Sequence, residues 1–194
     1  MAMTYLDHAA STPMRASAVE AMLPFFGERF ANPNGSHRFA RDARRAIDEA
    51  RDQVADVLGV RPGEVVFTGC GTESDNAAIV GAGGLSVCPA AEHHAVLHPV
   101  EEDGGRVVGV DPGGHVDLDR LAGALDGAVR LVSVMTVNNE VGTVTDLAAV
   151  SALVRERAPQ ALLHTDAVQA PSWIDLRSIA PLVALREGPY KFVH

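Results

Sequence analysis

The sequence has very little lysine. Lys191 is the only lysine among 194 residues, and the other fifteen basic side chains are arginines. Acidic residues outnumber them at 25, so the formal net charge is −9. In the densest basic stretch, residues 38–51, arginines alternate with acids on a helical pattern, which is typical of a solvated helix face. Because nucleic-acid binding requires clustered positive charge, this balance predicts no nucleic-acid partner.

Long apolar runs and cysteines are also scarce. No stretch of about 18 apolar residues is present, which argues against a membrane-spanning helix and predicts no membrane partner. The N-terminal residues MAMTYLDHAAS lack the basic region and apolar stretch of a secretory signal. Two cysteines, Cys70 and Cys88, do not make a disulfide framework. Together these features favour a cytoplasmic protein.

Metal-binding patterns are absent as well. Residues 88–98 contain Cys88, His93, His94 and His98, but neither H-E-x-x-H nor paired C-x-x-C spacing occurs there. The sequence therefore predicts no metal site. Two interpretations stay open for this segment: a histidine stacked on an aromatic cofactor ring, or a histidine that simply begins a helix.

Short β-branched runs alternate with longer helical patterns along the chain. In residues 39–58, apolar side chains recur at three- and four-residue spacing, and Gly59 follows as a helix cap. Such alternation predicts an α/β fold with a mostly parallel sheet that is covered on both faces. The expected strands are 64–68, 106–110, 129–137 and 161–166, and the expected helices are 18–26 (interrupted by Pro24), 39–58, 72–82, 117–125 and 146–157.

A glycine-containing turn follows the expected strand 64–68. Ligands of open parallel sheets bind beyond the carboxyl ends of the strands, so residues at these ends are the candidates for chemistry. Gly69 and Gly71 lead into a helix, where free N–H groups, the positive helix end and the Thr72 hydroxyl favour an anion such as phosphate. A dinucleotide-binding fingerprint competes, but Ser74 replaces its third glycine. A plain helix cap by Thr72 is the other alternative.

Polar side chains also follow the two later strands. Asn138, Asn139 and Glu140 come after residues 129–137, either as turn formers or as amides that hold a ring substituent of a cofactor. Asp166 ends the strand 161–166, where an ionised carboxylate needs a cationic partner or a capping role. A protonated pyridine nitrogen would be such a partner, and pyridoxal phosphate (PLP) enzymes use this pairing to maintain their electron sink. Gln169 lies three residues further on.

Six stretches of the chain together resemble the cysteine desulfurases, PLP enzymes of the class V aminotransferase group. The resemblance is ordered, runs from residue 5 to about residue 179 and implies the three-layer α/β/α large domain of fold type I PLP enzymes. It also implies an N-terminal segment over residues 1–13, an incomplete PLP-binding large domain over residues 14–194 and an absent small domain. The stretches are YLDHAAST, NPNGSHRFARDAR, VVFTGCGTESDNAAI, EHHAV, VSVMTVNNEVGTV and HTDAVQAPSWIDL.

The resemblance also implies roles for individual residues. Gly71 and Thr72 would hold the cofactor phosphate, and His93 would stack on the pyridine ring and assist proton transfers. Asn139 and Gln169 resemble the two amides on the side of the ring hydroxyl. Asp166 resembles the partner of the pyridine nitrogen.

The lysine region departs from the family pattern. Family members show Ser-Gly-His-Lys or Ser-Ala-His-Lys there, and the lysine is the residue that forms the Schiff base with PLP. With one residue deleted after Val183, Lys191 falls on the lysine position, Tyr190 falls on the histidine position, and Gly188 replaces the serine. The resemblance thus identifies Lys191 as the Schiff-base residue in a changed neighbourhood.

The family reaction converts L-cysteine to L-alanine and leaves the sulfur on an enzyme cysteine as a persulfide, which supplies iron–sulfur clusters or thio-modified tRNA. L-cysteine, a sulfur acceptor or scaffold protein and a second copy of the chain are therefore the expected partners. Neither Cys70 nor Cys88 matches the family nucleophile, and the arginine that holds the substrate carboxylate has no counterpart. A catalytically silent remnant and a selenocysteine lyase or other class V relative remain alternatives.

Overall fold

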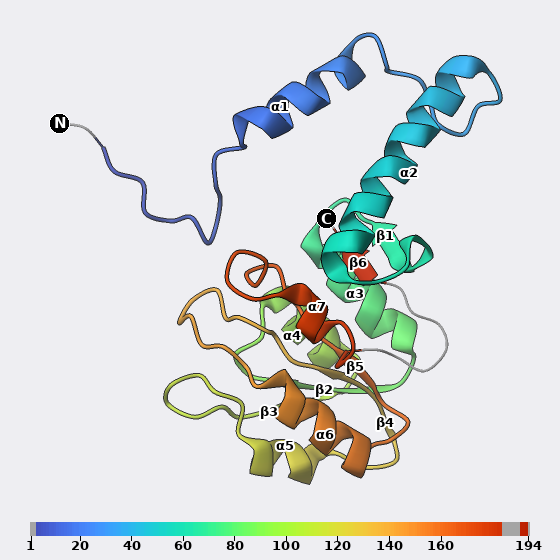
Figure 1. Ribbon diagram of the computed structural model, residues 1–194. Helices are drawn as coiled ribbons and strands as arrows, with labels where there is room; N and C mark the ends of the chain where they lie inside the picture. The colour runs from blue at the N-terminus through green and yellow to red at the C-terminus, as the bar shows by residue number, and fades with distance from the viewer. Residues whose placement is uncertain (1–2, 184–190, 194) are drawn as a thin grey trace.

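The computed structural model describes residues 3–183 and 191–193 as an α/β fold (Figure 1). None of the helices in this part of the chain has the length and apolar character that crossing a membrane requires. The helices are α1 Ala16–Met22, α2 Arg38–Leu58, α3 Gly71–Ala82, α4 His94–Glu102, α5 Leu118–Ala124, α6 Leu147–Arg157 and α7 Leu176–Ile179, with the 3-10 turns η1 Leu23–Phe26 and η2 Pro62–Glu64. The strands are β1 Val65–Phe67, β2 Leu85–Pro89, β3 Arg106–Val108, β4 Val129–Ser133, β5 Leu162–His164 and β6 Lys191–Val193.

The strands form two parallel sheets. Four strands pair in the order β3-β2-β4-β5, and β1 pairs with β6. Helices α4, α5 and α6 connect successive strands of the larger sheet, as parallel pairing requires. Within the described residues, antiparallel pairing occurs only at two isolated bridges, between Val110 and Val116 and between Val137 and Val144. The predicted α/β fold with a mostly parallel sheet is confirmed.

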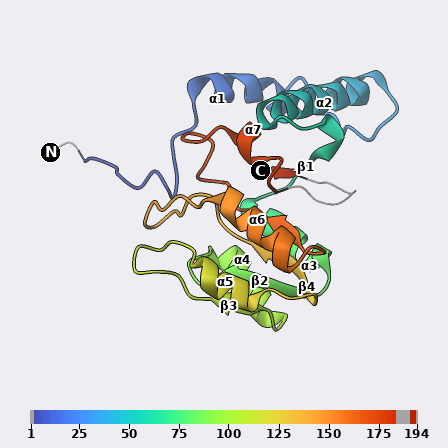
Figure 2. The ribbon, with the colours of Figure 1, turned by 60° about the horizontal axis from the view of Figure 1, so that its bottom comes forward.

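The larger sheet has an apolar cluster on each face, and neighbouring strand residues belong to opposite clusters. On β4, Leu131 belongs with Ile79 of α3 and Val96 of α4, whereas Val132 belongs with Leu121 of α5. Successive strand side chains point to opposite faces, so this division places α3 and α4 on one face and α5 and α6 on the other. In Figure 2, α1 and α2 lie along the side of the molecule opposite α5 and β3. The three-layer arrangement follows from these two clusters.

Helix α2 begins and ends where the sequence predicts a long helix. The His37 side chain caps its first turn by accepting the Ala40 N–H at 3.2 Å. Gly59 ends the helix with φ of 70°, a left-handed conformation that favours glycine. A Cβ at Gly59 would also lie 3.0 Å from Cγ of Arg177, whose guanidinium donates to the Asp56 carbonyl at 2.7 Å. Glycine at this position therefore permits both the helix end and the contact with α7.

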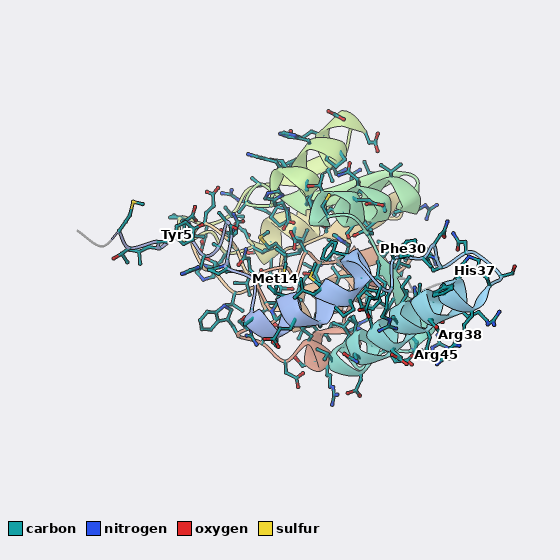
Figure 3. The ribbon with its side chains drawn as sticks, turned by 90° about the horizontal axis from the view of Figure 1, so that it is seen from above. Tyr5, Met14, Phe30, His37, Arg38 and Arg45 are labelled. Carbon is teal, nitrogen blue, oxygen red and sulfur yellow. The ribbon has the colours of Figure 1, made fainter. Side chains whose placement is uncertain are left out.

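The N-terminal region is the most exposed part of the described chain. Residues 3–15 contain no helix or strand, and neither α1 nor η1 has a buried residue. Figure 3 shows Tyr5 and Met14 along this region and Phe30 near the start of α2. All three side chains are more than half exposed. The proposed division at residue 13 stays a prediction.

Between α3 and β3 lie two elements whose ranges the sequence analysis did not predict, although it left open a helix that begins at a histidine there. Strand β2 is a five-residue run that ends in Pro89, and α4 contains Pro99 in its interior. Pro99 lacks the N–H that would bond the Ala95 carbonyl one turn earlier. The Asn76 side chain of α3 donates to that carbonyl at 3.2 Å and so replaces the missing bond. The helix is completed by a contact between two helices, which local sequence patterns do not reveal.

Replacing Asn76 with Ala should lower the free energy of unfolding by about 1–2 kcal/mol, because the part-buried Ala95 carbonyl loses its donor. In a Pro99→Ala background the new backbone N–H supplies that donor, so the same replacement should cost less than half as much. Urea unfolding of the two single variants and the double variant measures the difference. An equal cost in both backgrounds would show that the Asn76–Ala95 bond does not compensate for Pro99.

Candidate active site

The predicted site residues lie after the carboxyl ends of the parallel strands. Gly71 and Thr72 follow β1, His93 follows β2, Asn139 follows β4, and Asp166 follows β5. Parallel strands direct these ends to one edge of their sheet, so His93, Asn139 and Asp166 share the edge of the larger sheet. The structure thus brings together three residues that are separated by up to 73 positions.

The turn after β1 presents an uncapped helix N-terminus. Helix α3 begins at Gly71, one residue earlier than predicted, and its N-cap residue Cys70 makes no side-chain cap bond. Thr72 is therefore inside the helix, and the alternative that it caps α3 is wrong. Nearby, the Glu73 carboxylate accepts the Gly69 N–H at 2.7 Å and orders the turn. With Cys70 not capping the first turn and the Thr72 hydroxyl exposed, this end of α3 suits an anion.

His93 begins helix α4 and keeps an exposed ring. Its Nδ1 accepts the Ala95 N–H at 3.1 Å, so the interpretation of a histidine at a helix start is confirmed. The same ring lies at the edge of the larger sheet, which leaves stacking on a cofactor as a compatible second role. His94 and His98 stack on each other with ring centroids 5.0 Å apart. Among residues 3–183 and 191–193, no three His, Cys, Asp or Glu residues are grouped as a metal site.

Asn138 is a turn former. Its Oδ1 accepts the N–H groups of Glu140 and Val141, both at 2.9 Å, while its Nδ2 donates to the Ala91 carbonyl at 2.8 Å. The turn-forming interpretation is therefore confirmed for Asn138. Asn139, which follows it, is half-buried.

Asp166 caps a turn rather than a helix. Its Oδ1 accepts the Val168 N–H at 2.9 Å, and its carbonyl accepts the Thr136 N–H at 2.9 Å. That second bond extends the pairing of β4 and β5 beyond both strands. Gln169 donates from Nε2 to the Ala9 carbonyl at 3.0 Å and so contacts the N-terminal segment. The backbone of Asp166 is thus bonded to the segment that follows β4.

Two further acids, Asp75 of α3 and Glu92 after β2, are buried near Asp166. They are 6% and 7% exposed. Burial raises the pKa of Asp75 to about 7, with Asp166 adding to the shift. Burial likewise raises the pKa of Glu92 to about 8; the N–H of Met135 opposes this shift, and Asp166 and Asp75 add to it. The sequence analysis missed both acids, because only long-range packing buries them.

His164 connects this acidic group to β4. Its Nδ1 lies 2.8 Å from the Ser133 hydroxyl, and its Nε2 lies 3.7 Å from Oδ1 of Asp75. Serine, histidine and aspartate in this order resemble a nucleophilic triad. Ser133, however, is 0% exposed at the end of the inner strand β4, so no substrate reaches it. The three residues form a buried polar chain beneath the site.

The backbone of Lys191 lies at the amino-terminal end of β6, opposite Val65 of β1. The turn at residues 69–71 follows Phe67, at the other end of the same pair, about 7 Å further along at 3.3 Å per residue. The Lys191 side chain and residues 184–190, including Gly188 and Tyr190, lie outside the described residues. The assignment of Lys191 as the Schiff-base residue therefore stays a prediction.

The two cysteines differ in accessibility, and their reactivity should differ accordingly. Cys88 is 0% exposed, and burial together with Glu92 and Glu101 raises its pKa to about 12, whereas Cys70 is exposed. We expect a thiol reagent at pH 8 to modify Cys70 at least about 100-fold faster than Cys88, because the thiolate is the reacting form. Mass spectrometry of timed samples measures both rates, with Cys70→Ser as the control. Equal rates in the folded chain would contradict the buried position of Cys88.

Stability should fall as the pH rises from about 4.5 to about 8. Asp75 and Glu92 bind protons more tightly in the folded chain than in the unfolded chain, so their contribution is complete at low pH and is lost above their raised pKa values. Each pKa unit corresponds to about 1.4 kcal/mol, so the loss should reach a few kcal/mol. Urea unfolding across this range tests it. The Asp75→Asn/Glu92→Gln variant should show a flatter profile, and an unchanged slope would contradict the assignment.

The chain is similar to known proteins in sequence and in fold. The profile of the family described as aminotransferase class-V matches residues 4–176. The cysteine desulfurase IscS of Dictyoglomus turgidum is 42% identical over 177 residues, which are 85% of this chain and 44% of that protein. A solved NifS-like protein has a TM-score of 0.77 at 36% identity, over 84% of this chain and 48% of the other. A second solved structure, SspA in complex with cysteine, has a TM-score of 0.80 at 34% identity. The match covers 87% of this chain and 51% of SspA.

The chain thus spans about half the length of the proteins that it matches. The family profile nevertheless covers most of this chain, including the turn after β1, His93, Asn139, Asp166 and Gln169. The strand ends where these residues lie are therefore inside the matched region. The chain belongs to the aminotransferase class-V family.

Proposed function

We propose that this chain is the cofactor-binding domain of a cysteine desulfurase. The observation that carries the proposal is the placement of an uncapped helix N-terminus, an exposed histidine and a carboxylate after the carboxyl ends of parallel strands. These features are the first turn of α3, His93 and Asp166. The relatives named cysteine desulfurase, 42% identical in the case of Dictyoglomus turgidum, support the choice of reaction.

PLP is the cofactor of this family, and the described residues fit it. The first turn of α3, which Cys70 leaves uncapped, suits a phosphate. The carboxylates of Asp75, Glu92 and Asp166 influence one another, and no arginine among the described residues offsets the raised pKa values of the first two. A site with this excess of acid favours a cation such as a protonated pyridine nitrogen. The phosphate and the ring nitrogen of PLP carry these two opposite charges.

The residues of the site have distinct roles in this proposal. PLP, when bound, supplies an electron sink for bonds at the substrate α-carbon. The Asp166 carboxylate would hold the proton on the ring nitrogen. His93 would lie on the ring face, and since its Nδ1 accepts the Ala95 N–H, the neutral ring carries its proton on Nε2, the atom that can move a proton. Asn139 would orient the ring hydroxyl together with Gln169.

The proposal includes L-cysteine as substrate, with alanine and an enzyme persulfide as products. SspA, solved in complex with cysteine, supports this substrate. Cys88 is buried, and Cys70 occupies the anion-binding turn, so neither is assigned as the persulfide-forming residue. That role is assigned to the portion of the relatives that this chain does not span. A sulfur-acceptor protein and a cytoplasmic location complete the proposal.

A homodimer is also part of the proposal. Large apolar side chains are exposed along the N-terminal region. Among them are Leu23, Phe26 and Phe30, whose exposed fractions are 59%, 76% and 78%. Exposed apolar surface of this kind marks an interface, because leaving it in water is unfavourable. A second copy of the chain would cover it.

The single lysine makes the cofactor proposal directly testable. Lys191 and the N-terminal amine are the only primary amines of the chain. After PLP addition and borohydride reduction, we expect a phosphopyridoxyl group on Lys191 and none on the N-terminus. Peptide mass spectrometry locates the group, and Lys191→Ala is the control. Modification of the N-terminus alone would contradict Lys191 as the PLP-bearing residue.

Asp166→Asn should weaken PLP binding by about 10-fold or more, because the amide cannot balance a protonated ring nitrogen. Asp126→Asn, a change to an exposed acid in the turn between α5 and β4, is the matched control and should leave the affinity unchanged. Titration of PLP fluorescence gives both dissociation constants. Equal affinities would argue against a role for Asp166 at the ring nitrogen.

A further inference from the structure

Glu92 is the most distinctive buried side chain near the site. It lies in the short turn between β2 and α4, immediately before His93, and is 7% exposed. Its Oε1 accepts the backbone N–H of Met135 at 2.6 Å. Its Oε2 is buried without a hydrogen-bond partner among the described residues. A buried carboxylate in contact with a distant backbone amide requires a structural explanation.

The explanation lies in the backbone beyond β4. There the N–H groups of Val134 and Thr136 donate to the carbonyls of His164 and Asp166, which continues the β5 ladder. Successive N–H groups of an extended chain point to opposite sides, so the Met135 N–H points to the side of β2. Strand β2 ends at Pro89, and the Pro89 carbonyl accepts the Glu92 N–H at 3.3 Å instead of pairing with β4. The Glu92 carboxyl group takes the place of that carbonyl.

A second bond connects the same two segments. Nδ2 of Asn138 donates to the carbonyl of Ala91 at 2.8 Å. Residues 91–92 are therefore attached to residues 135–138 at two points. His93 and Asn139 are the next residues of the two segments, and both are assigned to the cofactor ring in the proposed function. Any displacement of the β2–α4 turn would move His93 relative to Asn139.

We propose that Glu92 is a positioning residue of the cofactor site, which holds His93 in register with the end of β4. This inference rests on the proposed function. The acids that face Glu92 favour the neutral form: Asp75 comes from α3 and Asp166 follows β5, while the Cys88 thiol on β2 carries no positive charge. The neutral carboxyl group still offers Oε1 to the Met135 amide.

Two substitutions at Glu92 separate the hydrogen bond to Met135 from the charge of the carboxyl group. Glu92→Gln keeps a carbonyl oxygen at Oε1 and replaces the second oxygen with an uncharged amide, so it mimics the neutral acid. Glu92→Ala removes the bond to Met135 altogether. Glu102→Ala, which removes an exposed acid at the end of the adjacent helix α4, is the matched control.

PLP affinity gives the first readout. We expect the Glu92→Ala chain to bind PLP about 10-fold or more weakly, as when a buried polar partner is removed, and Glu92→Gln and Glu102→Ala to stay within about 3-fold of the parent chain. Circular dichroism establishes that each variant is folded. Unchanged affinity in a folded Glu92→Ala chain would overturn the positioning role. A loss in Glu92→Gln as large as that in Glu92→Ala would overturn the neutral form.

The backbone amide of Met135 gives a second readout that does not require PLP. In the ¹⁵N-labelled full chain, its proton shift should titrate with a midpoint near pH 8, where Glu92 ionises, and the titration should be absent in Glu92→Gln. A Met135 shift that titrates equally in both proteins would overturn the inference, even if Glu92→Ala fails to fold. Failure of the parent chain to bind PLP would contradict the proposed function instead, and the Met135 titration would still decide the contact and the protonation of Glu92.

Discussion

The parallel pairing of β4 with β2 on one side and with β5 on the other is the constraint on which the site depends. It directs the carboxyl ends of three strands to one edge, where His93, Asn139 and Asp166 follow them. It also determines which backbone groups are available beyond the strands. Thr136 bonds the Asp166 carbonyl, whereas the Met135 N–H faces the side where β2 has already ended. The site is therefore built on the same hydrogen-bond ladder that forms the core.

The second constraint is electrostatic. Asp75, Glu92 and Asp166 come from three segments of the chain and influence one another in a poorly solvated region. Burial of several carboxylates is unfavourable unless they are protonated or a cation joins them. The raised pKa values of Asp75 and Glu92 indicate that these two acids bind protons in the cofactor-free chain. In the proposed PLP site, a protonated ring nitrogen beside Asp166 would be the other way to balance these acids, and it would connect their proton binding to PLP binding.

Much of the fold is predictable from local patterns, and the exceptions have physical reasons. The apolar spacing and Gly59 predict α2, and the β-branched run 129–137 predicts β4. Strand β2 escapes prediction although it is as long as β4, because Val87 is its only β-branched residue, and the extent of helix α4 escapes prediction because Pro99 interrupts its pattern. Asn76 compensates for Pro99 from another helix, so the stability of α4 depends on a residue 19 positions away from the carbonyl that it bonds. Among the site residues, Asp166 is recognisable by its place after a strand, whereas Asp75 and Glu92 carry no such signal.

The sequence by itself determined the α/β alternation, the turn after β1, and the histidine, amide and carboxylate that follow β2, β4 and β5. These features depend on residue type and on local spacing, which a chain carries before it folds. Only the tertiary structure decided that Asp75 and Glu92 are buried beside Asp166, that Asn138 bonds the turn before His93, and that Ser133 is inaccessible. Burial, charge coupling and long-range hydrogen bonds depend on which segments come together, because desolvation and contact distance are properties of the packed chain.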